Sequence, residues 1–188
     1  MVVSLFVRLY FYNLKEFIMN KLNSAKTKWI TFTALFMAMN IAFSSFGIPV
    51  PGGHLYLCDI VICTASLLLD PVSAFIVGGV GSFLGDMFFY PAPMFVSLVT
   101  HGLQAAVISI IVHKKEEGGG RASVALFAGA VIMVVGYSLG RAYVYSTPEY
   151  AIIKLPYEIL QAVIGAVAAF ILCYKFNLKK IYERARAD

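Results

Sequence analysis

Apolar residues fall into six long stretches along the chain, separated by short polar breaks or by breaks that contain proline and glycine. The stretches cover residues 29–46, 54–69, 72–89, 94–112, 123–145 and 154–174. Runs of about 20 apolar residues are typical of helices that cross the hydrocarbon core of a bilayer. The pattern therefore predicts an all-α membrane protein, a bundle of six transmembrane helices.

The composition agrees with a membrane location. Of the 188 residues, 60% are hydrophobic and only 13% are charged, whereas soluble domains carry about 25% charged residues. The three cysteines, Cys58, Cys63 and Cys173, lie inside apolar stretches without CxxC spacing, which favours a packing role. Basic tracts interleaved with exposed aromatic residues are absent, so a nucleic-acid partner is not expected.

The positive charges predict the orientation. Lysine and arginine are concentrated in residues 21–28, 114–121 and 175–186, which all lie on one side of the membrane if there are six spans. Only Lys154 lies near the other side. Basic loops stay in the cytoplasm, so both termini are predicted to be cytoplasmic.

The chain is expected to have three parts. Residues 1–25 form an N-terminal extension that is either interfacial or not native, because the apolar run 2–12 is too short to span and is interrupted by Arg8. It has no clear cleavage site, so a signal peptide is not expected, and Met19 is a plausible natural start. Residues 26–176 form the membrane domain, and 177–188 form a basic cytoplasmic tail.

Polar side chains gather at one depth of the predicted bundle. At 1.5 Å per residue, they lie within roughly 10 Å of the outer surface. Polar groups at membrane depth are costly and usually functional, so this layer predicts a ligand pocket open to the outside. The candidates are Asp59, Asp86, His101, Gln104, Tyr137, Arg141, Lys154, Tyr157, Glu158 and Gln161.

Structural roles for these residues remain open. Asp86 could pair with Arg141, and Lys154 with Glu158, only to hold helices together. His101 could be a satisfied core histidine, and Asp59 a helix cap. A second feature is the ridge of small residues at Ala34, Ala38 and Ala42, which suits close helix packing inside the protein or docking of a partner.

Motifs of enzymes are missing. The chain has no His-Glu-x-x-His or Gly-x-Ser-x-Gly motif, no paired metal ligands at zinc spacing and no nucleotide-binding loop. We expect neither a catalytic residue, nor a metal site, nor a cofactor in this chain. A membrane enzyme or assembly protein, and a stand-alone secondary transporter, are the competing classes.

Several sequence features together resemble a known family. They are the alanine ridge, the following Pro/Gly loop, the segment 53–59 (Gly-His-Leu-Tyr-Leu-Cys-Asp), the glycine-rich run 70–86, and Tyr90-Pro91. The combination resembles the substrate-binding S component of energy-coupling factor (ECF) vitamin transporters, in the riboflavin-transporter-like branch. The resemblance covers about residues 26–176.

This resemblance implies a six-helix subunit that captures a vitamin or precursor outside the cell. It would dock onto a membrane T component and two cytoplasmic ATP-binding subunits, which use ATP and magnesium. The family's contact with the T component corresponds to Ala34, Ala38 and Ala42. A gating loop is implied at Ile48, Pro49, Pro51, Gly52 and Gly53, and the loaded subunit is thought to topple in the membrane.

The outer-layer charges indicate the ligand's chemistry. Arg141 and Lys154 stand against Asp59, Asp86 and Glu158, a net charge of about −1 with neutral His101. This favours a neutral, hydrogen-bonding heteroaromatic, such as a hydroxymethylpyrimidine or a pyridoxine-like compound. Pantothenate, bound through Arg141, and riboflavin are the alternatives.

Overall fold

The computed structural model describes residues 24–114 and 119–187. The chain divides into two compact units, residues 1–32 and 33–188. In the first unit, the described residues 24–32 are helical and belong to a helix that runs over residues 24–44. The expected N-terminal extension therefore lies almost wholly outside the described residues, and the arrangement below concerns the second unit.

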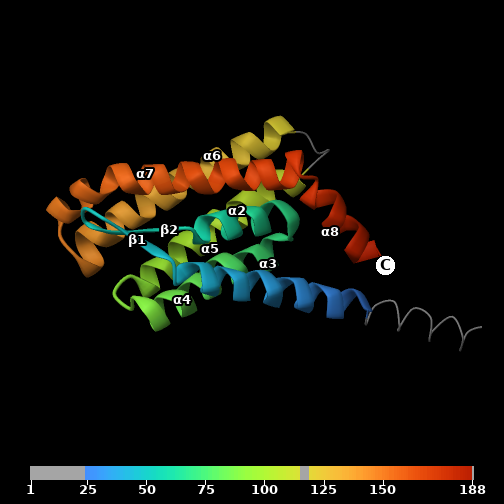
Figure 1. Ribbon diagram of the computed structural model, residues 1–188, viewed down its shortest axis with the longest axis horizontal. Coiled ribbons are helices and arrows are strands. Elements are labelled where there is room, and N and C mark those ends of the chain that lie inside the picture. Colours follow the sequence, from blue (N-terminus) through green and yellow to red (C-terminus); the bar gives the residue numbers. More distant parts are fainter. Residues whose placement is uncertain (1–23, 115–118, 188) are drawn as a thin grey trace, which may run out of the picture. The chain divides into compact units, whose positions relative to one another are not determined.

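The second unit is a bundle of helices with one β-hairpin (Figure 1). After the first helix come two antiparallel strands, and the remaining elements are helical, three of them π-helical turns (η). In order, they are β1 (Gly47–Val50), β2 (Gly53–Tyr56), α2 (Cys58–Leu68), α3 (Pro71–Phe75), η1 (Ile76–Val80), α4 (Gly81–Phe89), α5 (Met94–His113), α6 (Gly119–Gly140), η2 (Arg141–Tyr145), α7 (Pro148–Phe170), η3 (Ile171–Lys175) and α8 (Leu178–Ala187).

Within the described ranges, four helical stretches are long and apolar enough to cross a bilayer. They are Pro71–Phe89, Met94–His113, Gly120–Tyr145 and Pro148–Lys175. The mainly helical, multi-pass character predicted from the sequence is thereby confirmed. Helix α2 has 11 residues, about 17 Å at 1.5 Å per residue, which is shorter than the hydrocarbon core. The total of six spans and the cytoplasmic termini stay predictions.

Two predicted boundaries were wrong. Residues 54–56 were expected to begin a helix, but they form β2, which pairs with β1 from Gly47–Tyr56 to Val50–Gly53. The reason is the turn between the strands: Pro51 precedes Gly52, whose φ of 82° suits glycine, and this is typical of a type II turn. Helix α7 begins at Pro148 rather than near 154, because proline fits the first helical turn, where its missing N–H costs nothing.

Close helix contacts explain the glycines of the third apolar stretch. A Cβ at Gly78 would lie 2.5 Å from the carbonyl oxygen of His101, so only glycine lets η1 lie this close to α5. Asn40 Nδ2 of the first helix donates to the carbonyl oxygen of Val77, which lies in the π-helical turn η1, over 2.7 Å. These contacts fix the positions of the helices that carry the polar residues.

The hairpin and the basic C-terminal helix lie at opposite ends of the second unit (Figure 1). Asn177, with a φ of 55°, separates α7 and η3 from α8. Helix α8 carries Lys179, Lys180, Arg184 and Arg186. The hairpin end is where the polar layer of the sequence comes together.

Candidate functional site

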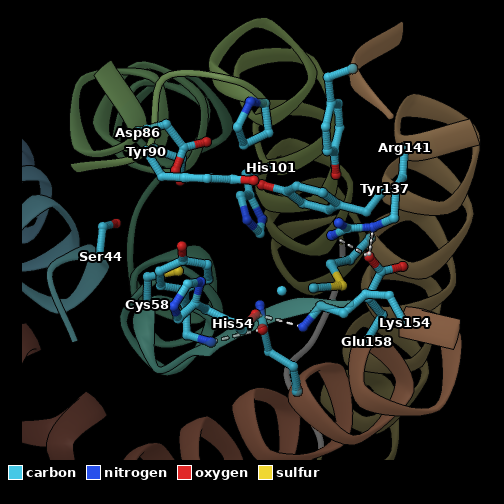
Figure 2. A pocket seen from close by; sticks show the side chains of 17 residues that line it. Ser44, His54, Cys58, Asp86, Tyr90, His101, Tyr137, Arg141, Lys154 and Glu158 are labelled. Carbon is cyan, nitrogen blue, oxygen red and sulfur yellow. Dashed lines mark hydrogen bonds and ion pairs between the residues drawn. The ribbon is translucent and has the colours of Figure 1, made fainter. Parts of the chain in front are cut away.

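A pocket lies against the hairpin, and Figure 2 shows side chains that line it, among them His54 of the hairpin. Its walls come from the first helix, β2, the start of α2, α4, α5, α6, η2 and α7, and its open volume is about 40 Å³. It is lined by Ser44, Gly53, His54, Tyr56, Cys58, Ser82, Asp86, Tyr90, Pro93, His101, Met133, Tyr137, Arg141, Tyr145, Lys154, Glu158 and Gln161. Segments far apart in the sequence therefore meet around one polar and aromatic space.

Most of the residues predicted from the sequence belong to this pocket or lie directly behind it. Those that line it are Asp86, His101, Tyr137, Arg141, Lys154, Glu158 and Gln161. Asp59 and Gln104 do not line it, but they hydrogen-bond to residues that do. Tyr157 is half-buried and is not among the lining residues. A ligand-binding role for the set remains a prediction.

Two cations connect the rim of the pocket to the hairpin. Arg141 Nη2 and Glu158 Oε1 form an ion pair at 3.1 Å, and Arg141 Nη1 donates to the carbonyl oxygen of Gly52 at 3.1 Å. Lys154 Nζ donates to the carbonyl oxygen of His54 at 2.5 Å. Figure 2 shows both cationic side chains reaching across the pocket rim. We call these contacts the latch.

The latch corrects the pairs considered from the sequence. Glu158 pairs with Arg141 rather than with Lys154, although Lys154 lies one turn away on the same helix. Asp86 accepts a hydrogen bond from Ser97. Among the described residues, it forms no ion pair with Arg141. Because η2 packs against α7, the Arg141 guanidinium reaches the Glu158 carboxylate from across the helix interface.

A second network lies deeper and surrounds one carboxylate. Gln104 Nε2 donates to Asp59 Oδ1 at 3.2 Å, and Gln161 Nε2 donates to Asp59 Oδ2 at 2.6 Å. His101 Nδ1 lies 2.7 Å from Gln104 Oε1. The backbone N–H of Tyr56 donates to Gln161 Oε1 at 2.9 Å. These four side chains, Asp59, Gln104, Gln161 and His101, are at most 5% exposed, and we call them the floor.

A third chain of hydrogen bonds follows the wall formed by α4, α5 and α6. Ser97 Oγ donates to Asp86 Oδ2, so the hydroxyl of Tyr137, 2.5 Å from Ser97 Oγ, is the donor in the next contact. The ring of Tyr137 also lies 5.1 Å from that of His101, centre to centre. The hydroxyl of Tyr145 is buried and has no hydrogen-bond partner among the described residues.

Sequence reasoning missed the aromatic residues of the hairpin and its surroundings. His54 and Tyr56 of β2, Tyr90 after α4, and Tyr145 at the end of η2 all line the pocket. Burial, helped by the charge of Asp86, raises the pKa of Tyr56 to about 12, so its phenol stays a neutral hydrogen-bonding group. The available signal was the concentration of aromatics beside the Pro/Gly breaks.

Cys58, Asp59 and His101 offer ligand atoms that lie within 4.8 Å of one another. A thiolate, a carboxylate and an imidazole are ligands that zinc accepts. However, both oxygens of Asp59 and Nδ1 of His101 already have amide partners. The contacts in this cluster are therefore those of a hydrogen-bonded network.

The alanine ridge lies on a different surface. Ala34, Ala38 and Ala42 are exposed, whereas Phe36 and Asn40 of the same helix are buried. The described part of the chain therefore leaves the ridge uncovered, which disfavours the internal-packing alternative. Docking of a partner on the ridge remains a prediction.

Comparison with known proteins identifies the family. The model of the family described as ECF-type riboflavin transporter, S component, matches residues 24–180. A protein of Pyrococcus woesei described as an uncharacterized protein in the gap 3' region is 33% identical over 122 residues, 64% of this chain and 81% of that protein. The chain therefore belongs to the family of ECF-type riboflavin transporter S components, and it is a multi-pass membrane transport subunit rather than an enzyme.

Proposed function

We propose that this S component captures a small, planar, hydrogen-bonding heteroaromatic compound, of the hydroxymethylpyrimidine or pyridoxine type, in the pocket that lies against the hairpin. The observation that carries the proposal is the lining of the pocket. Four tyrosines and two histidines surround a few directed polar groups, a combination that suits stacking plus oriented hydrogen bonds. None of these lining residues requires a catalytic role to explain its place in the pocket.

The size of the pocket favours a small guest. An enclosed water needs about 10–15 Å³ of open volume. The pocket's open volume of about 40 Å³ therefore holds only a few waters. Any vitamin must therefore displace the hairpin to enter, and a one-ring compound needs the smallest displacement. Pro49, Pro51 and His54 are exposed on the hairpin, which supports a displacement of the hairpin toward solvent.

The charges argue against an acid as the ligand. Arg141 and Lys154 are the cations of the pocket, and both already bind Glu158 or hairpin carbonyl oxygens. A carboxylate such as that of pantothenate would have to displace these partners. Pantothenate is thus a weaker candidate than a neutral heteroaromatic.

Riboflavin is the second candidate, because the matching family is described as a riboflavin transporter component. Its three-ring system is much larger than the closed pocket and would require the hairpin to swing fully away. Comparison of riboflavin with a one-ring compound in one binding assay separates the two candidates.

We further propose that the subunit delivers its ligand together with a T component and two ATP-binding subunits, which supply ATP hydrolysis. Membership in the family supports this assembly. The location of the pocket supports an outward opening, because the basic helix α8 lies at the opposite end of the second unit. By the positive-inside rule, that basic end is the cytoplasmic one.

The decisive experiment is purification of the full chain from its expression host, followed by native mass spectrometry to identify any bound small molecule. Titration with a hydroxymethylpyrimidine, pyridoxine, pantothenate and riboflavin then ranks the affinities. We expect a one-ring heteroaromatic to bind most tightly. Preferential binding of riboflavin or pantothenate would contradict the proposal and select the alternative.

A further inference from the structure

The floor contains enough hydrogen bonds to determine the direction of each one. The starting point is the backbone N–H of Tyr56, which can only donate, and which contacts Gln161 Oε1 at 2.9 Å. The amide of Gln161 must therefore turn its NH₂ group toward Asp59, where Nε2 lies 2.6 Å from Oδ2. The orientation of Gln161 thus follows from backbone chemistry.

The carboxylate of Asp59 also determines the orientation of the Gln104 amide. A carboxylate only accepts hydrogen bonds, so Gln104 directs its Nε2 toward Asp59 Oδ1 at 3.2 Å. Its Oε1 then faces His101 Nδ1 at 2.7 Å. Because an amide oxygen cannot donate, the proton of this hydrogen bond belongs to Nδ1. The reverse orientation of Gln104 would require a proton on Asp59.

The proton on Nδ1 decides what His101 offers to the pocket. In a neutral imidazole, one nitrogen donates and the other accepts, so Nε2 carries the lone pair. Over the described residues, the hydrogen bonds of His101 go through Nδ1 and none reaches Nε2. His101 lines the pocket, so its unpaired nitrogen is the part available to a ligand.

Asp86 supplies a second acceptor on the same side of the pocket. Its Oδ2 receives the hydrogen bond from Ser97, and no described residue donates to Oδ1. Figure 2 shows Asp86 and His101 on the side of the pocket opposite Lys154 and Glu158. We call His101 Nε2 and Asp86 Oδ1 the acceptor wall. On the other side, the two cations are occupied by the latch.

We propose that Asp59 is a positioning residue that fixes the tautomer of His101, and that the acceptor wall selects a ligand with N–H or O–H donors. The ligand class is an amino-substituted or hydroxyl-bearing heteroaromatic, neutral or cationic, and not an acid. This inference rests on the proposed function for the identity of the pocket. The tautomer itself is a property of the ligand-free protein.

The first test needs no ligand. Full-length protein with ¹⁵N-labelled histidine, reconstituted in nanodiscs, is examined by NMR, and the signals of His101 are identified by their loss in His101→Asn. The expected pattern is a protonated Nδ1 and an unprotonated Nε2. A proton on Nε2, protons on both nitrogens, or a stoichiometric zinc ion in elemental analysis would each overturn the tautomer assignment.

The second test uses a matched ligand pair: an aminopyrimidine carrying a hydroxymethyl group, and the same compound with methyl in place of the amino group. The amino compound is expected to bind at least about tenfold more tightly, because the methyl compound leaves acceptors unpaired. Equal affinities would overturn the donor requirement. Failure of both to bind would overturn the proposed ligand class, while the NMR result would still decide the tautomer.

The third test examines the positioning role through Asp59→Asn, with Asp70→Asn as the matched control. Asparagine at 59 presents both a donor and an acceptor, and because the N–H of Tyr56 fixes Gln161, Gln104 must turn over, which shifts the proton of His101 from Nδ1 toward Nε2. We expect the discrimination between the two pyrimidines to fall to about two- to threefold. Asp70 lies at the start of α3, where asparagine caps a helix equally well, so discrimination should be unchanged. Retained discrimination and an unchanged tautomer in Asp59→Asn would overturn the role of Asp59.

Discussion

The floor and the latch are both polar networks at the same end of the bundle, but they are built differently. The floor joins α2, α5 and α7 through one carboxylate, two amides and one imidazole, which are at most 5% exposed. The latch joins η2 and α7 to backbone carbonyls of a two-stranded hairpin. A two-stranded hairpin has little stability of its own.

From this difference we infer separate roles for the two networks, which remain to be tested. The floor is held by rigid helices, so it is suited to recognising a ligand in one orientation. The latch holds a weak element by a few contacts to its backbone, so it is suited to opening and closing. Gln161 links the floor to the hairpin that the latch holds, because it donates to Asp59 through Nε2 and accepts from the N–H of Tyr56 through Oε1. The variants below test this comparison, in order of decreasing effect on ligand binding.

Arg141→Ala should have the largest effect. It removes two hydrogen bonds to Glu158 and one to Gly52, and it leaves the Glu158 carboxylate buried without its cation. Loss of one partner of such a pair costs about 3–5 kcal/mol. Thermal unfolding in detergent and ligand titration measure the loss. The double variant Arg141→Met, Glu158→Met should recover most of the thermal stability without recovering binding. Wild-type affinity in Arg141→Ala would show that the latch is dispensable.

Gln161→Leu should have the next largest effect. Asp59 and the N–H of Tyr56 each lose a hydrogen bond in a buried site, which costs about 1–3 kcal/mol per group. Both thermal stability and affinity should fall, because the variant affects the floor and the hairpin together. Val163→Leu, on the exposed face of the same helix, is the control. A loss of affinity without faster hydrogen exchange of the hairpin amides would argue against the proposed link between the floor and the hairpin through Gln161.

Lys154→Met should mainly change rates. Methionine keeps the apolar stem but loses the hydrogen bond to His54, so the hairpin should open more often. We expect dissociation of the ligand to become about tenfold faster, corresponding to about 1.4 kcal/mol, with little change in unfolding temperature. Hydrogen exchange at residues 47–56 checks the opening directly. An unchanged dissociation rate would mean that the hairpin does not control release.

Tyr157→Phe should change affinity by less than about 0.5 kcal/mol. The sequence placed Tyr157 with Lys154 and Glu158, but the structure leaves it out of the pocket lining. Tyr137→Phe is the contrasting variant, because its hydroxyl donates to Ser97 within the wall. A larger loss in Tyr157→Phe than in Tyr137→Phe would place the pocket elsewhere.

Ala38→Leu should leave ligand affinity unchanged and abolish ATP-dependent uptake. The ridge residue is exposed and belongs to neither the floor nor the latch. Its enlargement would prevent close approach of a partner helix. Uptake into proteoliposomes that contain the T component and both ATP-binding subunits measures the effect, with Leu35→Met on a neighbouring exposed position as control. Normal uptake in Ala38→Leu would contradict docking on the ridge.

The sequence was informative wherever the cost of burial in lipid is large. Asp59, Glu158 and Lys154 stand out in apolar stretches, and they do lie in the polar networks of the pocket end. It was less informative about the partners: neighbours one turn apart on a helix suggested Lys154 with Glu158, whereas Arg141 of η2 lies closer. Helix contacts depend on rotation of each helix about its axis, which a pattern of hydrophobic residues determines only coarsely.

The hairpin shows the same limit. Pro51 and Gly52 clearly predicted a turn, but the residues after it, Gly53 to Tyr56, have the same apolar character as the helix that follows. Only pairing with Gly47–Val50 makes them a strand. The aromatic residues His54 and Tyr56 line the pocket for this reason, and the concentration of aromatics beside the Pro/Gly break was the local signal for it.

By itself, the sequence determined that this is a membrane protein, that it resembles S components, and that its polar groups lie at one end of the helices. These properties follow from the length of the apolar stretches and from the cost of burying charge, which both depend on local sequence. Only the tertiary structure decided which polar groups bind one another, that residues of the hairpin line the pocket, and that Asp59 accepts hydrogen bonds from two glutamines. These are properties of contacts between helices distant in the chain, and hydrogen-bond direction follows from complete networks rather than from single residues.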